Sequence, residues 1–314
     1  RGLHKTKENL LITETKDGMI HQTVDVVPGE GFVFGLFNSS VITYGNAQKL
    51  PANTLLATGT TDAKGNLTFS GLYPHGDYYL KEISVPDGWL LSTDKYPVKL
   101  TENKAAIENV ITVYLDEPIL NRLIYTPVTI TNTDITGAKK LPGALIEVYD
   151  ADGNTIFREY TNANGEISNI PVVPGTYTFK ETYAPSGYAL NTAIKTFTVT
   201  ADGKVTGDTV IRDELNMVML KKIRQNGEAL SGAVFGLFDE KNTKIQEATS
   251  AADGSVVFQQ IPYGAYKIRE LSAPYGYHSS EEEWPIVVNG TYLNPSTILV
   301  AVINQDAPGR IKIL

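Results

Sequence analysis

One short phrase recurs three times along the 314 residues of this chain. Each copy has a glutamate, a proline four residues later, a glycine six residues later and an aromatic residue seven residues later. The copies start at Glu82, Glu181 and Glu270, so the repeat steps are 99 and 89 residues. A repeat of this length is a whole domain. The sequence therefore predicts three tandem domains, at residues 1–122, 123–214 and 215–314.

Each repeated glutamate lies in a run with the alternation of a β-strand: YYLKEIS, YTFKETY and YKIRELS. A tyrosine four residues earlier shares its face in all three runs, because successive strand side chains point to opposite sides. These tyrosines are Tyr78, Tyr177 and Tyr266. An acid on the buried side of a domain must be paired, neutral or reactive.

Other features of the repeat indicate short strands joined by turns. Turn glycines precede each glutamate by 16 or 17 residues, in DAKGN, NANGE and AADGS, where Gly and Asn tolerate the positive φ of a hairpin. Apolar strands opened by glycine begin at Gly31, Gly143 and Gly232. The first lies 51 residues before its glutamate and the others 38, so the first copy carries 13 extra residues. We expect the extra residues in SSVITYGNAQKLPANT, as a surface loop able to carry binding contacts.

The composition supports an all-β protein and excludes several functions. The 27 Gly, 16 Pro and 17 Tyr favour many strands and turns, and no segment predicts a helix. A net charge of −8 with scattered lysines argues against nucleic-acid binding, and no apolar run predicts a membrane span. The absence of cysteine excludes disulfides and thiol catalysis, and four scattered histidines predict neither a metal nor a cofactor. With no signal peptide or initiator Met, we expect a piece of a longer polypeptide.

The order of glycine-led strand, turn glycines and glutamate phrase resembles the collagen-adhesin B-type repeats of Gram-positive surface proteins, which include SpaA-like pilins. The resemblance covers nearly the whole chain. It implies three immunoglobulin-like or prealbumin-like (transthyretin-like) β-sandwiches. It also implies that a lysine on the first strand joins an Asn or Asp on the last strand in a spontaneous isopeptide bond, promoted by the repeated glutamate. Burial favours the neutral amine that must attack, and it keeps the glutamate protonated for proton relay.

The resemblance assigns residues most directly in the third copy. The strand VMLKKI places Lys222 at the lysine position, with Lys221 as the alternative one residue away, and ILVAVINQDAP places Asn304 on the closing strand. Glu270 is the corresponding acid. In the first copy the assignment is Lys5, Asp116 and Glu82, with Lys7 left open as the lysine.

The second copy has no lysine at the corresponding position. Its first strand, VTITNTD, holds Asn132 there, while Glu181 and Asp213 remain. We therefore predict no bond in this domain unless Lys139 or Lys140 reaches the site. Without a cation, one of the two acids should be protonated, or both should bond to Asn132.

Three function classes follow from these observations. The first is a structural stalk or pilin shaft that cross-links itself once and is not an enzyme, on the bacterial cell surface and anchored through a missing C-terminal region. The second is an adhesin that binds a host matrix protein or glycan through the first-domain loop and exposed tyrosines such as Tyr44 or Tyr73. The third, an enzyme on the same sandwich, has no support in the chain. Other pilin subunits or the cell wall are the expected partners, through regions outside this sequence.

Overall fold

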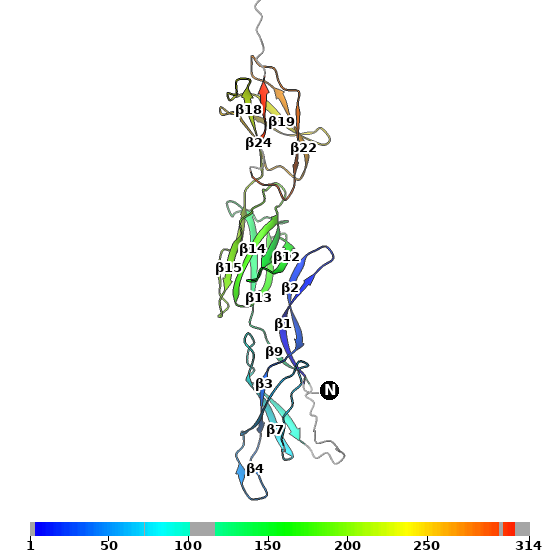
Figure 1. Cartoon of the computed structure of the whole chain (residues 1–314), viewed down its shortest axis with the longest axis vertical. Coiled ribbons are helices and arrows are strands. Elements are labelled where there is room, and N and C mark those ends of the chain that lie inside the picture. The colour runs from blue at the N-terminus through cyan, green and yellow to red at the C-terminus, as the bar shows by residue number, and fades with distance from the viewer. Residues whose placement is uncertain (1–3, 72, 101–116, 295–297, 305–314) are drawn as a thin grey trace, which may run out of the picture.

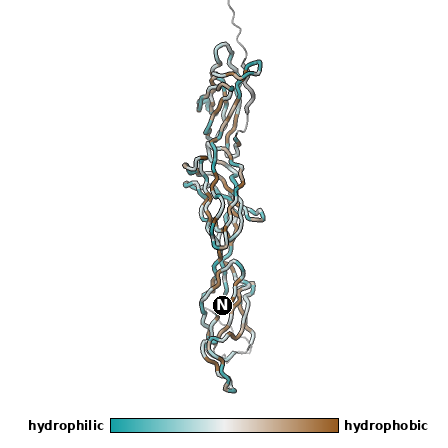
Figure 2. Tube along the Cα trace, turned by 90° about the vertical axis from the view of Figure 1, so that its left-hand side faces the viewer, coloured by the Kyte–Doolittle hydropathy of each residue, from teal (hydrophilic) through white to brown (hydrophobic). Residues whose placement is uncertain are grey.

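The computed structural model describes residues 4–71, 73–100, 117–294 and 298–304, the last of these through its backbone. They form an elongated column of β-domains joined end to end (Figure 1), and a view turned by 90° shows the same arrangement (Figure 2). The described residues form strands, turns and loops and no helix. This part of the chain therefore contains no helix long and apolar enough to cross a membrane. The predicted all-β fold is confirmed.

The first domain contains two layers of strands and a small extra hairpin. One layer has the order β6-β3-β7-β8, and the other is built on the long hairpin β1–β2 with β9 beside β1. The extra hairpin β4–β5 lies within the predicted insertion. The strands are β1 (Lys5–Glu14), β2 (Ile20–Pro28), β3 (Val33–Asn38), β4 (Ile42–Thr43), β5 (Lys49–Leu50), β6 (Leu55–Thr60), β7 (Gly76–Ser84), β8 (Lys95–Leu100) and β9 (Ile119–Asn121).

The second domain repeats this plan with a layer β16-β15-β14-β11-β12 facing a layer β13-β10-β17. Its first and last strands, β10 and β17, pair in parallel. The strands are β10 (Thr126–Asp134), β11 (Leu145–Tyr149), β12 (Thr155–Tyr160), β13 (Glu166–Val172), β14 (Gly175–Tyr183), β15 (Lys195–Val199), β16 (Val205–Gly207) and β17 (Val210–Asp213).

The third domain has the layers β20-β19-β22-β23 and β21-β18-β24. Its first and last strands, β18 and β24, are again parallel neighbours. The strands are β18 (Met217–Arg224), β19 (Val234–Asp239), β20 (Lys244–Thr249), β21 (Ser255–Gln259), β22 (Gly264–Ser272), β23 (Glu283–Val288) and β24 (Ile298–Asn304).

Alternating apolar residues build the core between the layers of each domain. In β14, Tyr177, Phe179 and Glu181 are buried, while the residues between them are only half-buried. Tyr78 and Tyr266 are buried in the same way in β7 and β22, so the predicted shared face of tyrosine and glutamate is confirmed. Each tyrosine hydroxyl donates to a backbone carbonyl four residues earlier, which satisfies its polar end in the core.

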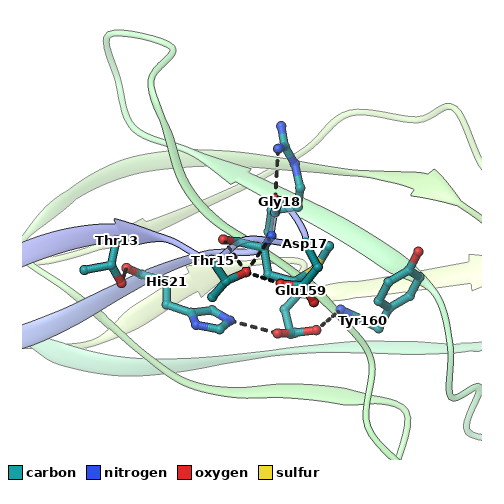
Figure 3. Close-up of polar contacts among 9 residues, drawn as sticks. Thr13, Thr15, Asp17, Gly18, His21, Glu159 and Tyr160 are labelled. Carbon is teal, nitrogen blue, oxygen red and sulfur yellow. Dashed lines mark hydrogen bonds and ion pairs between the residues drawn. The ribbon is translucent and has the colours of Figure 1, made fainter.

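A hairpin from the first domain extends the sheet of the second. Strand β2 pairs with β12 at Ile20 and Arg158, which joins the hairpin to the second domain as one eight-stranded sheet. Around this pairing, His21 Nε2 lies 2.8 Å from Glu159 Oε2, and Arg158 donates to the carbonyl of Gly18 (Figure 3). Further along β2, Gln22 donates to the carbonyl of Pro171 at 2.6 Å. The first two domains are therefore joined by a packed interface as well as by the connecting chain.

The second and third domains meet through backbone hydrogen bonds. Ala184 N donates to Gly290 O, and Leu190 N donates to Tyr292 O. The hydroxyl of Tyr263 donates to Ala184 O, and its ring packs edge-on against Tyr183. Both joints thus hold the domains in line.

Candidate functional site

The three repeated glutamates are held in the same way inside their domains. In each case Oε2 accepts a hydrogen bond from the backbone N–H ten residues further on, at 2.7–2.9 Å. The pairs are Glu82 with Ser92, Glu181 with Asn191, and Glu270 with Ser280. A backbone donor thus fixes the position of each carboxyl group inside its domain.

The lysine position on the first strand is fixed by the repeated turn glycine. The backbone N–H of Lys222 donates to Gly254 O at 2.7 Å, and Lys5 with Gly65 and Asn132 with Gly165 repeat this contact. A Cβ at Gly254 would lie 2.3 Å from Lys222 O, and φ there is +78°. Only glycine allows this approach in that backbone conformation.

The last strand brings an amide or acid to the same place in every domain. In each domain the residue at the lysine position pairs in parallel with a last-strand residue: Lys5 with Ile119, Asn132 with Ile211, and Lys222 with Val302. Two residues after each of these partners comes Asn121, Asp213 or Asn304. Residues two apart on a strand share a face. Asn121, Asp213 and Asn304 are thus equivalent in register.

In the third domain a buried lysine faces a buried glutamate. Lys222 Nζ lies 3.2 Å from Glu270 Oε2, and neither side chain is exposed. Burial lowers the pKa of Lys222, and the charge of Glu270 partly offsets this effect. Lys221, the alternative, lies on the outer side, with Nζ 3.0 Å from Asp253 Oδ2.

In the first domain Lys5 is the buried lysine, and it lies beside Phe32, with Nζ 4.2 Å from the ring centroid. Nζ donates to Ile119 O at 3.0 Å. Burial lowers the pKa of Lys5 to about 8, against the opposing charge of Glu82. Lys7 lies nearer the surface, over the ring of Trp89.

The residue beside Glu82 is Asn121, which the sequence analysis overlooked. Asn121 Nδ2 donates to Glu82 Oε2 at 2.7 Å, and the side chain is buried. Asp116, the predicted partner of Lys5, lies outside the described residues. Backbone bridges support the equivalence of Asn121 and Asp213. In the first two repeats the aromatic residue of the glutamate phrase bridges the residue two positions after the last-strand Asn or Asp: Trp89 with Leu123, and Tyr188 with Leu215.

In the second domain the site holds an amide and two acids. Asn132 Nδ2 donates to Glu181 Oε1 at 3.0 Å, and among the described residues neither oxygen of buried Asp213 has a hydrogen-bond partner. Burial raises the pKa of both carboxyls, and the charge of Asp213 raises that of Glu181 further. Lys139 and Lys140 are exposed and lie outside this site.

The predicted adhesive residues are arranged differently from the expectation. Tyr44 is exposed near the tip of the β4–β5 hairpin, but Tyr73 is half-buried and packs against the core of the first domain. The expectation of an exposed Tyr73 was therefore wrong, because its ring covers apolar side chains. The part of the chain that the structure describes contains no cluster of three or more His, Asp or Glu side chains able to hold a metal.

Comparison with known families agrees with this repeated geometry. The family model described as the SpaA prealbumin-like fold domain matches residues 13–114, 126–214 and 216–299. The chain belongs to this family.

Individual related proteins match this chain over a shorter segment or at lower sequence identity. The trypsin-resistant surface T6 protein of Streptococcus pyogenes is 40% identical over 60 residues, which cover 19% of this chain and 11% of that protein. Colossin-A of Dictyostelium discoideum is 25% identical over 277 residues, or 76% of this chain and 2% of that protein. This chain therefore spans only a small part of these relatives.

Two solved structures align with most of this chain at low identity. The Bacillus anthracis TIE protein aligns over 96% of this chain and 58% of its own, with 21% identity and a TM-score of 0.47. BcpA, the major pilin subunit of Bacillus cereus, aligns over 96% and 100%, with 15% identity and a TM-score of 0.39.

Proposed function

We propose that this chain is a load-bearing stalk region of a Gram-positive cell-surface protein or pilin, hardened by two self-formed isopeptide bonds. The observation that carries the proposal is the buried lysine in the first and third domains, placed on the first strand beside a buried glutamate and the last strand. Taking an ammonium group out of water is costly even when a carboxylate lies nearby, so a lysine enclosed in this way needs a specific role. Other subunits or the cell wall would be its partners, outside this sequence.

The bonds proposed are Lys222–Asn304 with Glu270, and Lys5–Asn121 with Glu82. The neutral lysine amine attacks the amide carbon of asparagine, the new C–N bond forms, and the old C–N bond breaks. The one proton that the amine gives up passes through the glutamate to the departing NH2 group, which leaves as ammonia. Enclosure in the core fixes amine and carbonyl together, which supplies much of the rate.

The geometry around Glu82 is suited to that relay. Glu82 Oε1 and Asn121 Oδ1 are both buried, and neither has a hydrogen-bond partner among the described residues. With a proton on Glu82 Oε2 and the Asn121 amide turned over, Glu82 would donate to Asn121 Oδ1, in place of the contacts that Nδ2 now makes with Glu82 Oε2 and Leu90 O. It would also polarise the carbonyl that Lys5 attacks.

Intact mass under denaturing conditions tests the proposal. Two Lys–Asn bonds predict a total loss of about 34 Da, whereas a Lys5–Asp116 bond in place of Lys5–Asn121 would give about 35 Da, because water leaves instead of ammonia. Asn121→Ala should remove one loss, and the matched variant Asp116→Ala should keep both. An unshifted wild-type mass would refute the proposal. If Asp116→Ala alone removes a loss, Asn121 is the wrong partner.

A further inference from the structure

The second domain differs from its neighbours at one decisive position. Asn132 is fully buried at the place of Lys5 and Lys222, and its amide nitrogen is held by Glu181. An amide nitrogen does not attack a carboxyl group, since its lone pair is delocalised into its own carbonyl. The nearest lysines in sequence, Lys139 and Lys140, are exposed, and Lys139 Nζ lies over the ring of Tyr188.

The strands that carry tension in this domain are joined by hydrogen bonds. Tension along the column enters at the start of β10 and leaves at the end of β17. The two strands are parallel and pair from Thr131 with Val210 to Asp134 with Asp213. Pulled from opposite ends, they are loaded in shear. Each backbone hydrogen bond contributes only about 0.5–1.5 kcal/mol net to stability.

The core of this domain is nevertheless complete. Its apolar cluster includes buried side chains from both layers, among them Ile130, Ile146, Phe179 and Ile211. The glutamate, the turn glycine and the last-strand acid are in their repeated places. The second domain is therefore a folded member of the series that lacks the nucleophile, and it is not a degenerate remnant.

We propose that the second domain is the extensible element of the stalk: under load it unfolds and refolds, while the first and third domains stay locked. The proposal rests on the proposed function, because it needs the bonds in the two neighbouring domains. A covalent bond between the first and last strands of a domain carries tension past the rest of that domain. The second domain lacks the lysine needed for such a bond. The load then falls on β10 and β17, where the ladder is the only direct link between first and last strand that the described residues show.

The length released identifies this domain. About 80 residues lie between Asn132 and Asp213, and an extended chain spans at most about 3.3–3.6 Å per residue. Unfolding should therefore lengthen the molecule by on the order of 250 Å after subtraction of the folded span. The docked β1–β2 hairpin would lose its seat on β12 in the same event.

Single-molecule stretching of the whole chain, held at its two ends, tests the proposal. Intact mass of the same preparation first establishes how many bonds are present. With two bonds, the wild type should show one unfolding event of on the order of 250 Å, which recurs after relaxation. Glu270→Ala, which should remove the bond of the third domain, should add a second event.

The variant Asn132→Lys supplies the missing nucleophile beside Glu181 and Asp213. If it closes a third bond, the mass should fall by a further ~18 Da, because water leaves from Asp213, and the unfolding event should disappear. An event that persists in a molecule with three bonds would overturn the proposal, as would a doubly bonded wild type that shows no event. If Asn132→Lys forms no third bond, the comparison of wild type with Glu270→Ala decides the question. One unfolding event in the wild type and two in Glu270→Ala support the proposal, and any other pair of counts contradicts it. A wild type with no mass loss and three events would instead refute the proposed function.

Discussion

At the scale of single residues, each site depends on contacts that only particular side chains provide. The turn glycine is the clearest case, because it accepts the backbone N–H of the lysine position and lies against its carbonyl. The repeated glycine therefore fixes the backbone at the lysine position as well as forming a turn.

Substitution of this glycine should damage the third site. Gly254→Ala would bring Cβ to 2.3 Å from Lys222 O and would strain a φ of +78°. We expect a loss of stability of about 1–3 kcal/mol and a lower yield of the Lys222–Asn304 bond, measured by melting and by intact mass. Gly276→Ala is the matched control, since φ is +90° there but no atom lies within 4 Å of the new Cβ. Equal bond yields in the two variants would contradict a positioning role for Gly254.

The acid pair of the second domain should make that domain less stable as pH rises. A carboxyl whose pKa is raised by folding holds its proton more tightly in the folded state. Its contribution to stability is therefore complete below the unfolded value and is lost as pH rises toward the folded value. For Glu181 this loss begins near its ordinary value of 4.5. Each pH unit above it should cost at most about 1.4 kcal/mol while one proton is retained.

Calorimetry of the whole chain across the pH range measures this effect in the transition assigned to the second domain. In Glu181→Gln the pH dependence should be weaker, because the carboxyl whose pKa is raised by burial and by the charge of Asp213 is gone, and only Asp213 remains to titrate. Lys195 and Asp208, a more exposed pair in the same domain, provide the control: the hydrogen bond from Lys195 lowers the pKa of Asp208, so Asp208→Asn should leave the slope above about pH 5 unchanged. A second-domain transition that rises in temperature between about pH 5 and 8 would contradict the assignment.

At the scale of strands, the sequence predicted the regular parts of the fold and missed the contacts between distant segments. The alternation in YTFKETY was sufficient to place Tyr177 and Glu181 on one buried face. The segment ITVYLDEP predicts a strand ending in an acid, which points to Asp116. The spacing to the next first strand favours Asn121 instead, since Asp213 precedes Lys222 by 9 residues, and Asn121 and Asp116 precede Asn132 by 11 and 16.

No sequence signal predicts that the β1–β2 hairpin pairs with β12 of the second domain. Its pairing joins Ile20 to Arg158, and nothing in either local sequence specifies a partner so far along the chain. The periodicity of apolar residues predicts strands, but it does not predict which distant strand a single backbone pairing and a few side-chain contacts will join. This is why the predicted first domain ended where its own strands end, although part of it belongs to a sheet of the second.

Removal of the side-chain contacts at this seat should loosen the first joint. His21 and Glu159 are about one-third exposed, so their pair should contribute no more than about 1 kcal/mol. The double variant His21→Ala/Arg158→Ala should leave the melting of the first domain nearly unchanged and broaden the distance distribution between spin labels on the first and second domains, while the second domain also loses its internal Arg158–Glu147 pair. Asp77→Ala/Lys99→Ala, which removes an exposed pair within the first domain, is the control. Identical distributions for both double variants would show that the backbone pairing alone aligns the joint.

At the scale of the whole molecule, end-to-end domains with packed joints make a column in which the bonds should govern survival. A cross-link that closes a loop of roughly 100 residues is worth about 4–5 kcal/mol in the chain-entropy description. Proteases cut the open state, so its population sets the cleavage rate when opening is fast.

Trypsin digestion of the intact chain should measure that protection. Glu82→Ala/Glu270→Ala should be cleaved faster than the wild type by a factor on the order of 10² or more, in the first and third domains. Glu30→Ala/Glu240→Ala, at exposed positions, should be cleaved like the wild type. Equal half-lives for all three proteins would mean that the proposed bonds do not limit opening.

The hairpin that crosses the first joint also bears on the order in which the molecule assembles. The two strands are adjacent in sequence, and hairpins of this kind form in about 1–10 μs, whereas the contact of His21 with Glu159 spans 138 residues. Distant contacts wait for the segments between them to fold. The hairpin should therefore exist as a projecting arm before its seat on β12 exists. The first domain could then form the proposed Lys5–Asn121 bond at the base of the arm while the far end of the arm is still unattached. The alignment of the first two domains would be the last feature to form.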